Sequence, residues 1–586
     1  MDTQSSPAQD EQKHYTALVY FHGIGEQRRY EEVSRLVDEL DRYERDTKQA
    51  KDAPEPSFQS EPTRAGFEEA IGRQEVGYIR VSYNEKGTEY RFYEAYYADL
   101  LAAGIRPIEV FLWLLKLSLR PIKIMFTPWR ELSRLRRAIL LGDWDRRRKK
   151  ESVEGRERLD AEVQQLLDAN DEFENSHQPY RWSTSNFWQY LKHIKERKWD
   201  DADPTRVQWN AWFWLIRFIW VQFSIIVLVL TALLTLGLIA IGLIRFLLQL
   251  PTHVLPLEWN ILIGAIILGV GWGLSAFLRT YVGDLYFWSS YEETSEKHRK
   301  RADVLQRSCA YLSHVLSDPN CDRVVLVGHS MGTTVAHDTL LRLNLPQPEL
   351  DKIQYFVTLA SVVDKVYYLF ETVTSKSYQY KRIIEARRGD LGTPPFSADK
   401  NAPIPRIHWI NFWDLADVAS SALYTPTNHV FNPYHVVDNY EVAGVCFPDP
   451  SSAHLAYFKN SLVLKAISEV FFDNQHSFAA VLNSATLSSA EMAIKIPTLF
   501  IGQNAKRHWF TKVCQGAFIL IPWLILLYWI VSRFNAAIAN VSFFPALGVY
   551  TLVVIGFGLF DWVLRYRQNR VAKSKPQTGP ELMSTA

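Results

Sequence analysis

The fold is decided by the stretch DRVVLVGHSMGTTVAH, which occupies residues 322–337. A β-branched run at 324–327 leads into GHSMG at 328–332, and apolar residues at helical spacing follow over 335–341. β-Branched residues favour strands, and the later spacing favours a helix. The stretch therefore predicts a strand, a sharp turn and a helix, with Ser330 at the tip of the turn and its hydroxyl exposed.

A serine at such a turn is a candidate nucleophile, and we interpret Ser330 in this way. The small residues Gly328 and Gly332 let the chain turn tightly around it. The backbone N–H of Met331 then points at whatever Ser330 attacks, where it can stabilise a developing oxyanion. An ordinary serine in a glycine-rich turn is the alternative, and the surrounding strand and helix favour the nucleophile.

This pattern resembles the nucleophile elbow of the α/β-hydrolase superfamily, and specifically of its lipase and esterase-like serine hydrolases. The resemblance covers residues 15–104 and 285–475, which would form the two parts of one hydrolase domain. It implies an α/β fold, with a mostly parallel sheet and helices on both faces. It also implies a Ser, acid and His triad in that chain order.

An early strand and turn support the resemblance. Residues 15–21 have the pattern of a buried strand and run into HGIG at residues 22–25. In the resembled family, a turn of this kind supplies the second oxyanion N–H, which would belong to Ile24 here. His22, Gly23 and Gly25 would support that turn.

Later segments complete the predicted domain. Residues 30–45 read as a charged helix and 46–65 as a loop containing Pro and Ser. Residues 78–83 and 90–96 alternate like two sheet strands, and further strands are expected at 353–359, 406–412 and 441–446. These strands indicate where the triad acid and base should lie.

Three aspartates are candidates for the triad acid. Asp417 is preferred because it lies five residues beyond the strand predicted to end at Phe412. Asp414 is closer to that strand, and Asp364 follows the preceding strand, so both remain alternatives.

Three histidines are candidates for the base. His454 is preferred because it opens a helix in a small-residue loop after the last predicted strand. His429 and His435 lie in the loop before that strand and are the alternatives. His329 is adjacent to Ser330 and should point away from it, so we interpret it as a packing residue.

Uncharged segments predict membrane spans. Each of four segments contains no charged residue and is long enough for the about 20 residues needed to cross a bilayer. They form two hairpins, within 206–284 and 512–565, and their bounds are 218–244, 259–278, 513–532 and 534–560. Basic residues such as Lys512 and Arg565 flank the ends away from the hairpin loops, which places both termini and the hydrolase domain in the cytoplasm.

The remaining segments suit a protein beside a membrane. Residues 105–129 read as an interfacial amphipathic segment, because its charged residues share one helical face; these residues are Glu109, Lys116, Arg120 and Lys123. The alternative is a helix packed on the protein core. Residues 130–205 predict a charged helical insertion and 476–511 a linker, and 1–14 and 566–586 predict disordered termini.

Composition limits the classes of function. The 586 residues include 65 basic and 64 acidic side chains, and this balance argues against nucleic acid as a partner. An aromatic content of 13%, with 19 tryptophans, suits contact with membrane lipids. The four cysteines show no metal-binding spacing and are expected to be free thiols; they are Cys309, Cys321, Cys446 and Cys514. No metal or cofactor is expected.

Together these patterns predict a multi-pass membrane serine hydrolase that cleaves ester bonds of lipids or acylated amphiphiles through an acyl-enzyme on Ser330. The alternative is a non-catalytic membrane scaffold or transport accessory, with the hydrolase-like domain as a binding module. An ion channel is disfavoured because the spans carry no internal charge.

Overall fold

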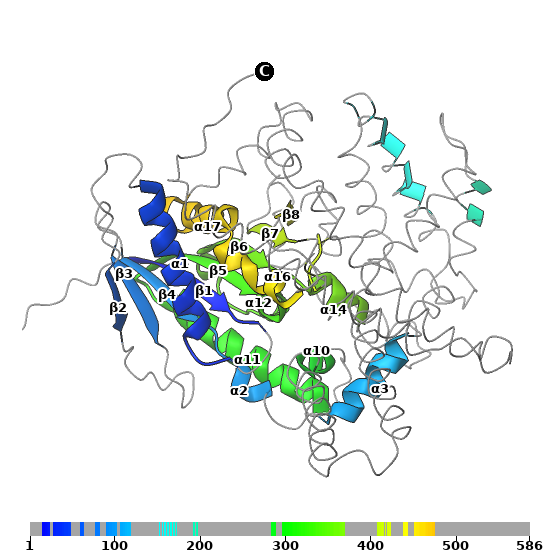
Figure 1. Cartoon of the computed structure of the whole chain (residues 1–586), viewed down its shortest axis with the longest axis horizontal. Helices are drawn as coiled ribbons and strands as arrows, with labels where there is room; N and C mark the ends of the chain where they lie inside the picture. The colour runs from blue at the N-terminus through cyan, green and yellow to red at the C-terminus, as the bar shows by residue number, and fades with distance from the viewer. Residues whose placement is uncertain are drawn as a thin grey trace, which may run out of the picture.

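The structure is a computed structural model that describes the α/β body of the chain (Figure 1). The described residues are 14–23, 27–48, 59–63, 77–82, 89–101, 106–118, 283–288, 296–369, 407–414, 417, 419–423, 437–442 and 450–474, with isolated positions between 152 and 196. The four predicted spans, the linker 476–511 and the predicted disordered segments 1–13 and 566–586 lie outside them. Within the described part of the chain, no helix combines the length and hydropathy of a membrane span.

Eight strands form one sheet, in the order β2-β3-β4-β1-β5-β6-β7-β8. Every neighbouring pair from β4 to β8 in this order is parallel, whereas β3 is antiparallel to both β2 and β4. The bounds are β1 Tyr15–Phe21, β2 Gln59–Thr63, β3 Tyr78–Ser82, β4 Glu89–Glu94, β5 Cys321–His329, β6 Ile353–Leu359, β7 His408–Trp413 and β8 Val437–Glu441. The predicted α/β class with a mostly parallel sheet is confirmed.

Helices cover both faces of the sheet (Figure 1). On one face, α1 (Glu31–Lys48) and α17 (Ser461–Ser468) pack together over alternate strand residues such as Val325, Val357 and Ile410. On the other face, α12 (Met331–Leu340) and α11 (Glu296–Ser317) contact β5. Burial on both faces is typical of parallel strands and explains their apolar sequences.

Two sequence predictions differ from the structure in this sheet. The predicted loop 46–65 contains the tail of α1 and the strand β2, whose Pro62 is tolerated because β2 lies at the edge of the sheet. The last described strand, β8, overlaps the predicted strand 441–446 only at Glu441; residues 443–446 lie outside the described residues. The polar Asn439 is accommodated in β8 because its side chain bonds Asn411 at 2.9 Å and Leu423 N–H at 2.8 Å.

The predicted interfacial segment contains a described helix, α3 (Pro107–Ser118). One side of α3 is buried, and its Trp113 ring meets Tyr286 of α10 (Gly283–Trp288) at 5.6 Å between centroids. The opposite side exposes Ile108 and Leu112 together with Glu109 and Lys116. The helix is therefore packed on the protein along one side; residues 119–129 lie outside the described residues.

Cys309 and Cys321 are free thiols, as expected. Burial raises the pKa of each thiol to about 11, so both stay protonated at neutral pH. Cys446 and Cys514 lie outside the described residues.

The parallel strands place several polar residues at one edge of the sheet. Because carboxyl ends of parallel strands meet at the same edge, the residues that follow β1, β5 and β7 come together there. These residues are His22, Ser330 and Asp414.

The other described helices are α2 (Ala98–Leu101), α13 (Gln347–Leu350), α14 (Val363–Leu369), α16 (Pro450–Leu455), the 3₁₀-helix η5 (Ala456–Lys459) and the π-helix η6 (Glu469–Asp473).

Candidate active site

The turn between β5 and α12 consists of one residue, Ser330. Its backbone has φ 55° and ψ −123°, a conformation that residues with side chains seldom adopt. Its N–H donates to the carbonyl of Leu359 at 2.9 Å, and its own carbonyl accepts from the N–H of Thr333 at 3.1 Å. These bonds hold a strained serine at the junction of strand and helix.

Two glycines make this turn possible. A Cβ atom on Gly328 would lie 2.9 Å from the Cα of Thr333, and one on Gly332 would lie 2.2 Å from the carbonyl oxygen of Phe21. Both obstacles are main-chain atoms, which cannot move aside as a flexible side chain can. The glycines are therefore required by close approach of the backbone.

The structure brings Ser330, His454 and Asp417 together. The Nε2 atom of His454 lies 2.7 Å from Oγ of Ser330, and its Nδ1 atom lies 2.9 Å from Oδ2 of Asp417. Both distances are within the normal range for hydrogen bonds. The three side chains, which come from distant parts of the chain, form one continuous hydrogen-bonded row.

Ser330 is buried, which differs from the exposed hydroxyl expected from the sequence. Only 3% of the residue is exposed. The His454 ring covers its hydroxyl, and the turn after β1 lies against it, since a Cβ on Gly23 would be 3.2 Å from the Ser330 Cβ. The elbow presents Ser330 to other residues of the site rather than to open solvent.

The acid position next to His454 is occupied by Asp417. The carboxylate also accepts from the N–H of Ala419 at 2.9 Å, so its two oxygens are held in place. Asp414 lies close by and donates its backbone N–H to the Tyr457 hydroxyl at 2.9 Å. Asp364 is buried in the first turn of α14. The 2.9 Å contact between Nδ1 of His454 and Oδ2 of Asp417 favours Asp417 as the acid over Asp414 and Asp364.

The pKa values of the pair shift in opposite directions. Burial alone would raise the pKa of Asp417, but the charge and hydrogen bond of His454 outweigh burial and lower it. Burial alone would lower the pKa of His454, but the adjacent Asp417 carboxylate raises it above the ordinary 6.5. The result is an ionised carboxylate beside an imidazole that binds a proton more readily than usual.

The turn after β1 is fixed by His22. Burial lowers the pKa of His22 to about 4, so the ring is neutral. Its Nδ1 donates to the Gly23 carbonyl at 2.8 Å, its Nε2 accepts from the N–H of Tyr97 at 3.2 Å, and the two rings stack at 4.0 Å between centroids. This turn leads directly to the predicted oxyanion donor Ile24, which lies outside the described residues together with Gly25.

Met331 opens α12, so its N–H belongs to the first turn of the helix, where backbone donors have no partner within the helix. This donor is next to Ser330 in the chain, where the resemblance implies an oxyanion contact. The alternative bases His429 and His435 lie outside the described residues.

Two further residues, Tyr457 and His329, belong to the site although the sequence pattern did not indicate this. The Tyr457 hydroxyl donates to Oδ2 of Asp417 at 3.0 Å. His329 was interpreted as a packing residue, but its Nε2 also contacts the carbonyl of His454 at 2.9 Å. The available signal was proximity in sequence, because Tyr457 follows His454 by three residues and His329 precedes Ser330.

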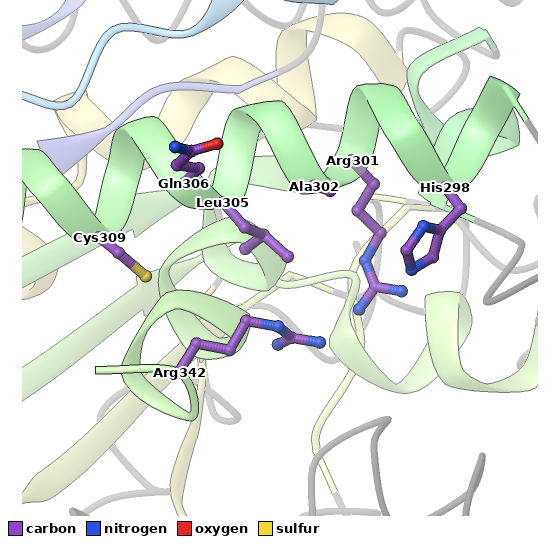
Figure 2. A pocket seen from close by; sticks show the side chains of 7 residues that line it. All are labelled: His298, Arg301, Ala302, Leu305, Gln306, Cys309 and Arg342. Carbon is purple, nitrogen blue, oxygen red and sulfur yellow. The ribbon is translucent and has the colours of Figure 1, made fainter. Parts of the chain in front are cut away.

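A cavity of about 410 Å³ lies elsewhere, between α11 and the end of α12 (Figure 2). It is lined by His298, Arg301, Ala302, Leu305, Gln306, Cys309 and Arg342. Its most buried cation, Arg301, already contacts the Asp338 carboxylate at 2.8 Å. None of the three side chains in the hydrogen-bonded row lines this cavity.

No known protein family, curated protein or solved structure matches this chain.

Proposed function

We propose that the protein is a serine hydrolase of the α/β-hydrolase type that cleaves carboxylic esters. The proposal depends most on one observation, the unbroken row of hydrogen bonds from Asp417 through His454 to Ser330. A serine hydroxyl is a weak nucleophile until a base removes its proton, and this row contains such a base. The strained backbone of Ser330 and the glycines around it also suit a nucleophile elbow.

Acylation begins when Oγ of Ser330 attacks the ester carbonyl carbon. Nε2 of His454 accepts the hydroxyl proton, and the Asp417 carboxylate stabilises the resulting imidazolium while remaining ionised. His454 then gives the proton to the departing alcohol oxygen, which leaves an acyl group bonded to Ser330. The raised pKa of His454 favours the first proton transfer.

The negative charge on the carbonyl oxygen needs preorganised donors. The N–H of Met331 is one, and the proposed second is the N–H of Ile24. Such donors act in a water-poor site, and loss of one from an oxyanion hole reduces kcat by about 10²–10³. Hydrolysis finishes when His454 removes a proton from water, whose oxygen attacks the acyl carbon. His454 then returns the proton to Oγ of Ser330 as the bond to the acyl carbon breaks and the carboxylic acid leaves.

The proposed substrates are membrane lipids or acylated amphiphiles. The support is the four uncharged segments of the sequence, each long enough to cross a bilayer. Two membrane hairpins would hold the hydrolase domain at the cytoplasmic face, where amphiphiles reach high local concentration. The Ile108 and Leu112 side chains exposed on α3 suit contact with a lipid surface.

The second candidate is a membrane scaffold or transport accessory in which the hydrolase-like domain only binds a partner. It needs no nucleophile, so it predicts no role for the short contacts of His454. A strained Ser330 is hard to explain in a scaffold, because such backbone conformations are unfavourable by about 1–3 kcal/mol. These points favour the enzyme.

A fluorophosphonate probe tests the proposal, because it phosphonylates an activated serine. We expect labelling of the full-length protein in detergent or liposomes, and loss of labelling in Ser330→Ala. Ser308→Ala is a matched control, since it removes another buried serine hydroxyl, in α11. No labelling of the wild type under either condition would favour the scaffold.

A further inference from the structure

His329 is the last residue of β5 and the neighbour of Ser330 in the chain. Its side chain is 3% exposed, and its Nε2 lies 2.9 Å from the main-chain carbonyl oxygen of His454. Ser330 contacts the ring of the same histidine. Two consecutive residues therefore hold His454, one by its ring and the other by its backbone.

The direction of this bond follows from protonation. Burial, with a smaller contribution from the charge of His454, lowers the pKa of His329 to about 4, so the ring carries one N–H at neutral pH. A carbonyl oxygen only accepts, and so that hydrogen must be on Nε2 of His329. Its Nδ1 is then a bare acceptor, and among the described residues no group donates to it. A carboxylate oxygen of Glu32 lies 3.9 Å from this Nδ1 atom.

The main-chain carbonyl of His454, which His329 contacts, lies where a hydrogen bond from outside the helix is expected. His454 lies in the last turn of α16, where carbonyl groups lack partners within the helix. The His329 ring also packs against the rings of His454 and Phe458, at 5.1 and 5.2 Å between centroids. The end of this short helix is thus fixed to β5 by a residue more than a hundred positions away in the sequence.

We propose that His329 is a positioning residue for the reaction at Ser330: its hydrogen bond holds the backbone of His454 so that Nε2 of His454 faces the serine hydroxyl. This inference rests on the proposed serine hydrolase function. Catalytic groups must be held closely, since a misplacement of about 1 Å can reduce the rate about 100-fold. The arrangement makes nucleophile and base share a single rigid support, the end of β5.

A pair of substitutions separates hydrogen bonding from packing. His329→Gln places an amide N–H near the position of the imidazole Nε2, whereas His329→Met has similar length and no donor. We expect His329→Met to reduce the rate of fluorophosphonate labelling, and kcat for a p-nitrophenyl ester, by about 10- to 100-fold. KM should change less than about threefold, and His329→Gln should recover most of the lost rate.

His337→Leu is the control for removing a buried imidazole, because His337 lies on α12 and packs against Trp409, on the other face of the sheet. It should leave the labelling rate unchanged. Equal rates for His329→Met and the wild type, or equal rates for His329→Met and His329→Gln, would overturn the positioning role. Failure of the wild type to label would instead overturn the proposed function.

A spectroscopic measurement on the wild-type protein tests the hydrogen bond itself. With ¹⁵N-labelled histidine in the full-length protein, the ring nitrogen shifts should show His329 as the neutral tautomer protonated on Nε2. The resonance can be identified by its disappearance in His329→Gln. A tautomer protonated on Nδ1, or a ring that is charged at neutral pH, would overturn the proposed hydrogen bond.

Discussion

Two buried aspartates lie near opposite ends of helix α12, which follows Ser330, and they are paired in different ways. Beyond the amino end, Asp417 contacts His454, a partner that can gain or lose a proton. Towards the carboxyl end, Asp338 contacts Arg301 at 2.8 Å and the indole N–H of Trp288 at 2.9 Å. Arg301 keeps its charge at every accessible pH.

The two pairs differ in whether the charge of the partner can change. The pKa of Asp338 is lowered because the charge of Arg301 outweighs burial, and the resulting ion pair is permanent across the physiological range. The pKa of Asp417 is also lowered against burial, but by a partner whose own charge varies during the proposed reaction. The first pair is suited to holding helices α11 and α12 together, and the second to moving a proton.

The largest effect is expected from Asp417→Asn. The change keeps the shape of the side chain but removes the charge that stabilises a protonated His454. We expect kcat for a p-nitrophenyl ester to fall by about 10⁴-fold, which is about 5.5 kcal/mol of activation free energy. Asp414→Asn is the matched control and should retain more than about a tenth of the activity; a reversed order would make Asp414 the acid.

Asp338→Asn should lower the stability of the fold and leave the activity of the folded protein largely unchanged. It leaves the guanidinium of Arg301, whose side chain is 2% exposed, without the carboxylate it contacts. Removing one partner of a buried ion pair destabilises a protein by about 3–5 kcal/mol, measurable by urea unfolding, while the folded fraction should keep its esterase activity. Asp322→Asn breaks an exposed contact with His14 and should change stability by less than about 1 kcal/mol.

If Asp338→Asn unfolded at the same urea concentration as the wild type, the stabilising role of the Asp338–Arg301 pair would be contradicted. A folded Asp338→Asn protein with no activity would show that the Arg301 pair also serves the reaction.

A smaller effect is expected from Tyr457→Phe. The Tyr457 hydroxyl stays protonated because burial, followed by the charge of Asp417, raises its pKa, so it remains a donor to that carboxylate. Hydrogen bonds to charged groups contribute about 1.5–3 kcal/mol, and we expect kcat to fall by about tenfold. Tyr311→Phe removes a buried hydroxyl in α11 and should leave kcat unchanged; an equal loss in both variants would contradict this role for Tyr457.

The smallest expected effect is a displacement of the pH profile. The base must be neutral, so kcat/KM should rise with pH through the pKa of His454, with a midpoint above 6.5 because Asp417 raises it. In Asp417→Asn the residual activity should have a lower midpoint. A wild-type midpoint below 6.5, or no displacement in the variant, would contradict the pairing.

The contribution of His454 to the free energy of unfolding should fall over the same pH range in which kcat/KM rises. A raised His454 pKa stabilises the folded protein fully below pH 6.5, and this contribution is lost as pH rises through the folded pKa. The lowered pKa of Asp338 stabilises the fold above 3.8, and its contribution is constant at neutral pH because Arg301 does not titrate there.

Much of the site could be predicted from the sequence because local patterns specify it. The β-branched run before GHSMG requires a strand, and the two glycines permit the turn at Ser330. The chain order implied by the resemblance then made Asp417 and His454 the preferred partners among three aspartates and three histidines. Close contacts between these residues depend on loops, and the sequence alone left three aspartates open.

The remainder depends on tertiary structure. Burial of Ser330 arises from the approach of His454 and Gly23, which no local pattern records. The roles of Tyr457 and His329 require knowledge of where α16 and η5 lie against β5. The sequence did not predict β8 at its observed position, because the polar residue Asn439 forms its hydrogen bonds with residues from other segments of the chain.

The central claim is that Ser330 is a nucleophile activated by His454. Rapid-quench kinetics with a p-nitrophenyl ester, followed by mass spectrometry of the Ser330 peptide, tests it most directly. The account predicts a burst of one p-nitrophenol per protein molecule and an acyl adduct on Ser330, both absent in Ser330→Ala and strongly slowed in His454→Ala. An adduct on another residue, or a burst that is unchanged in His454→Ala, would contradict the account.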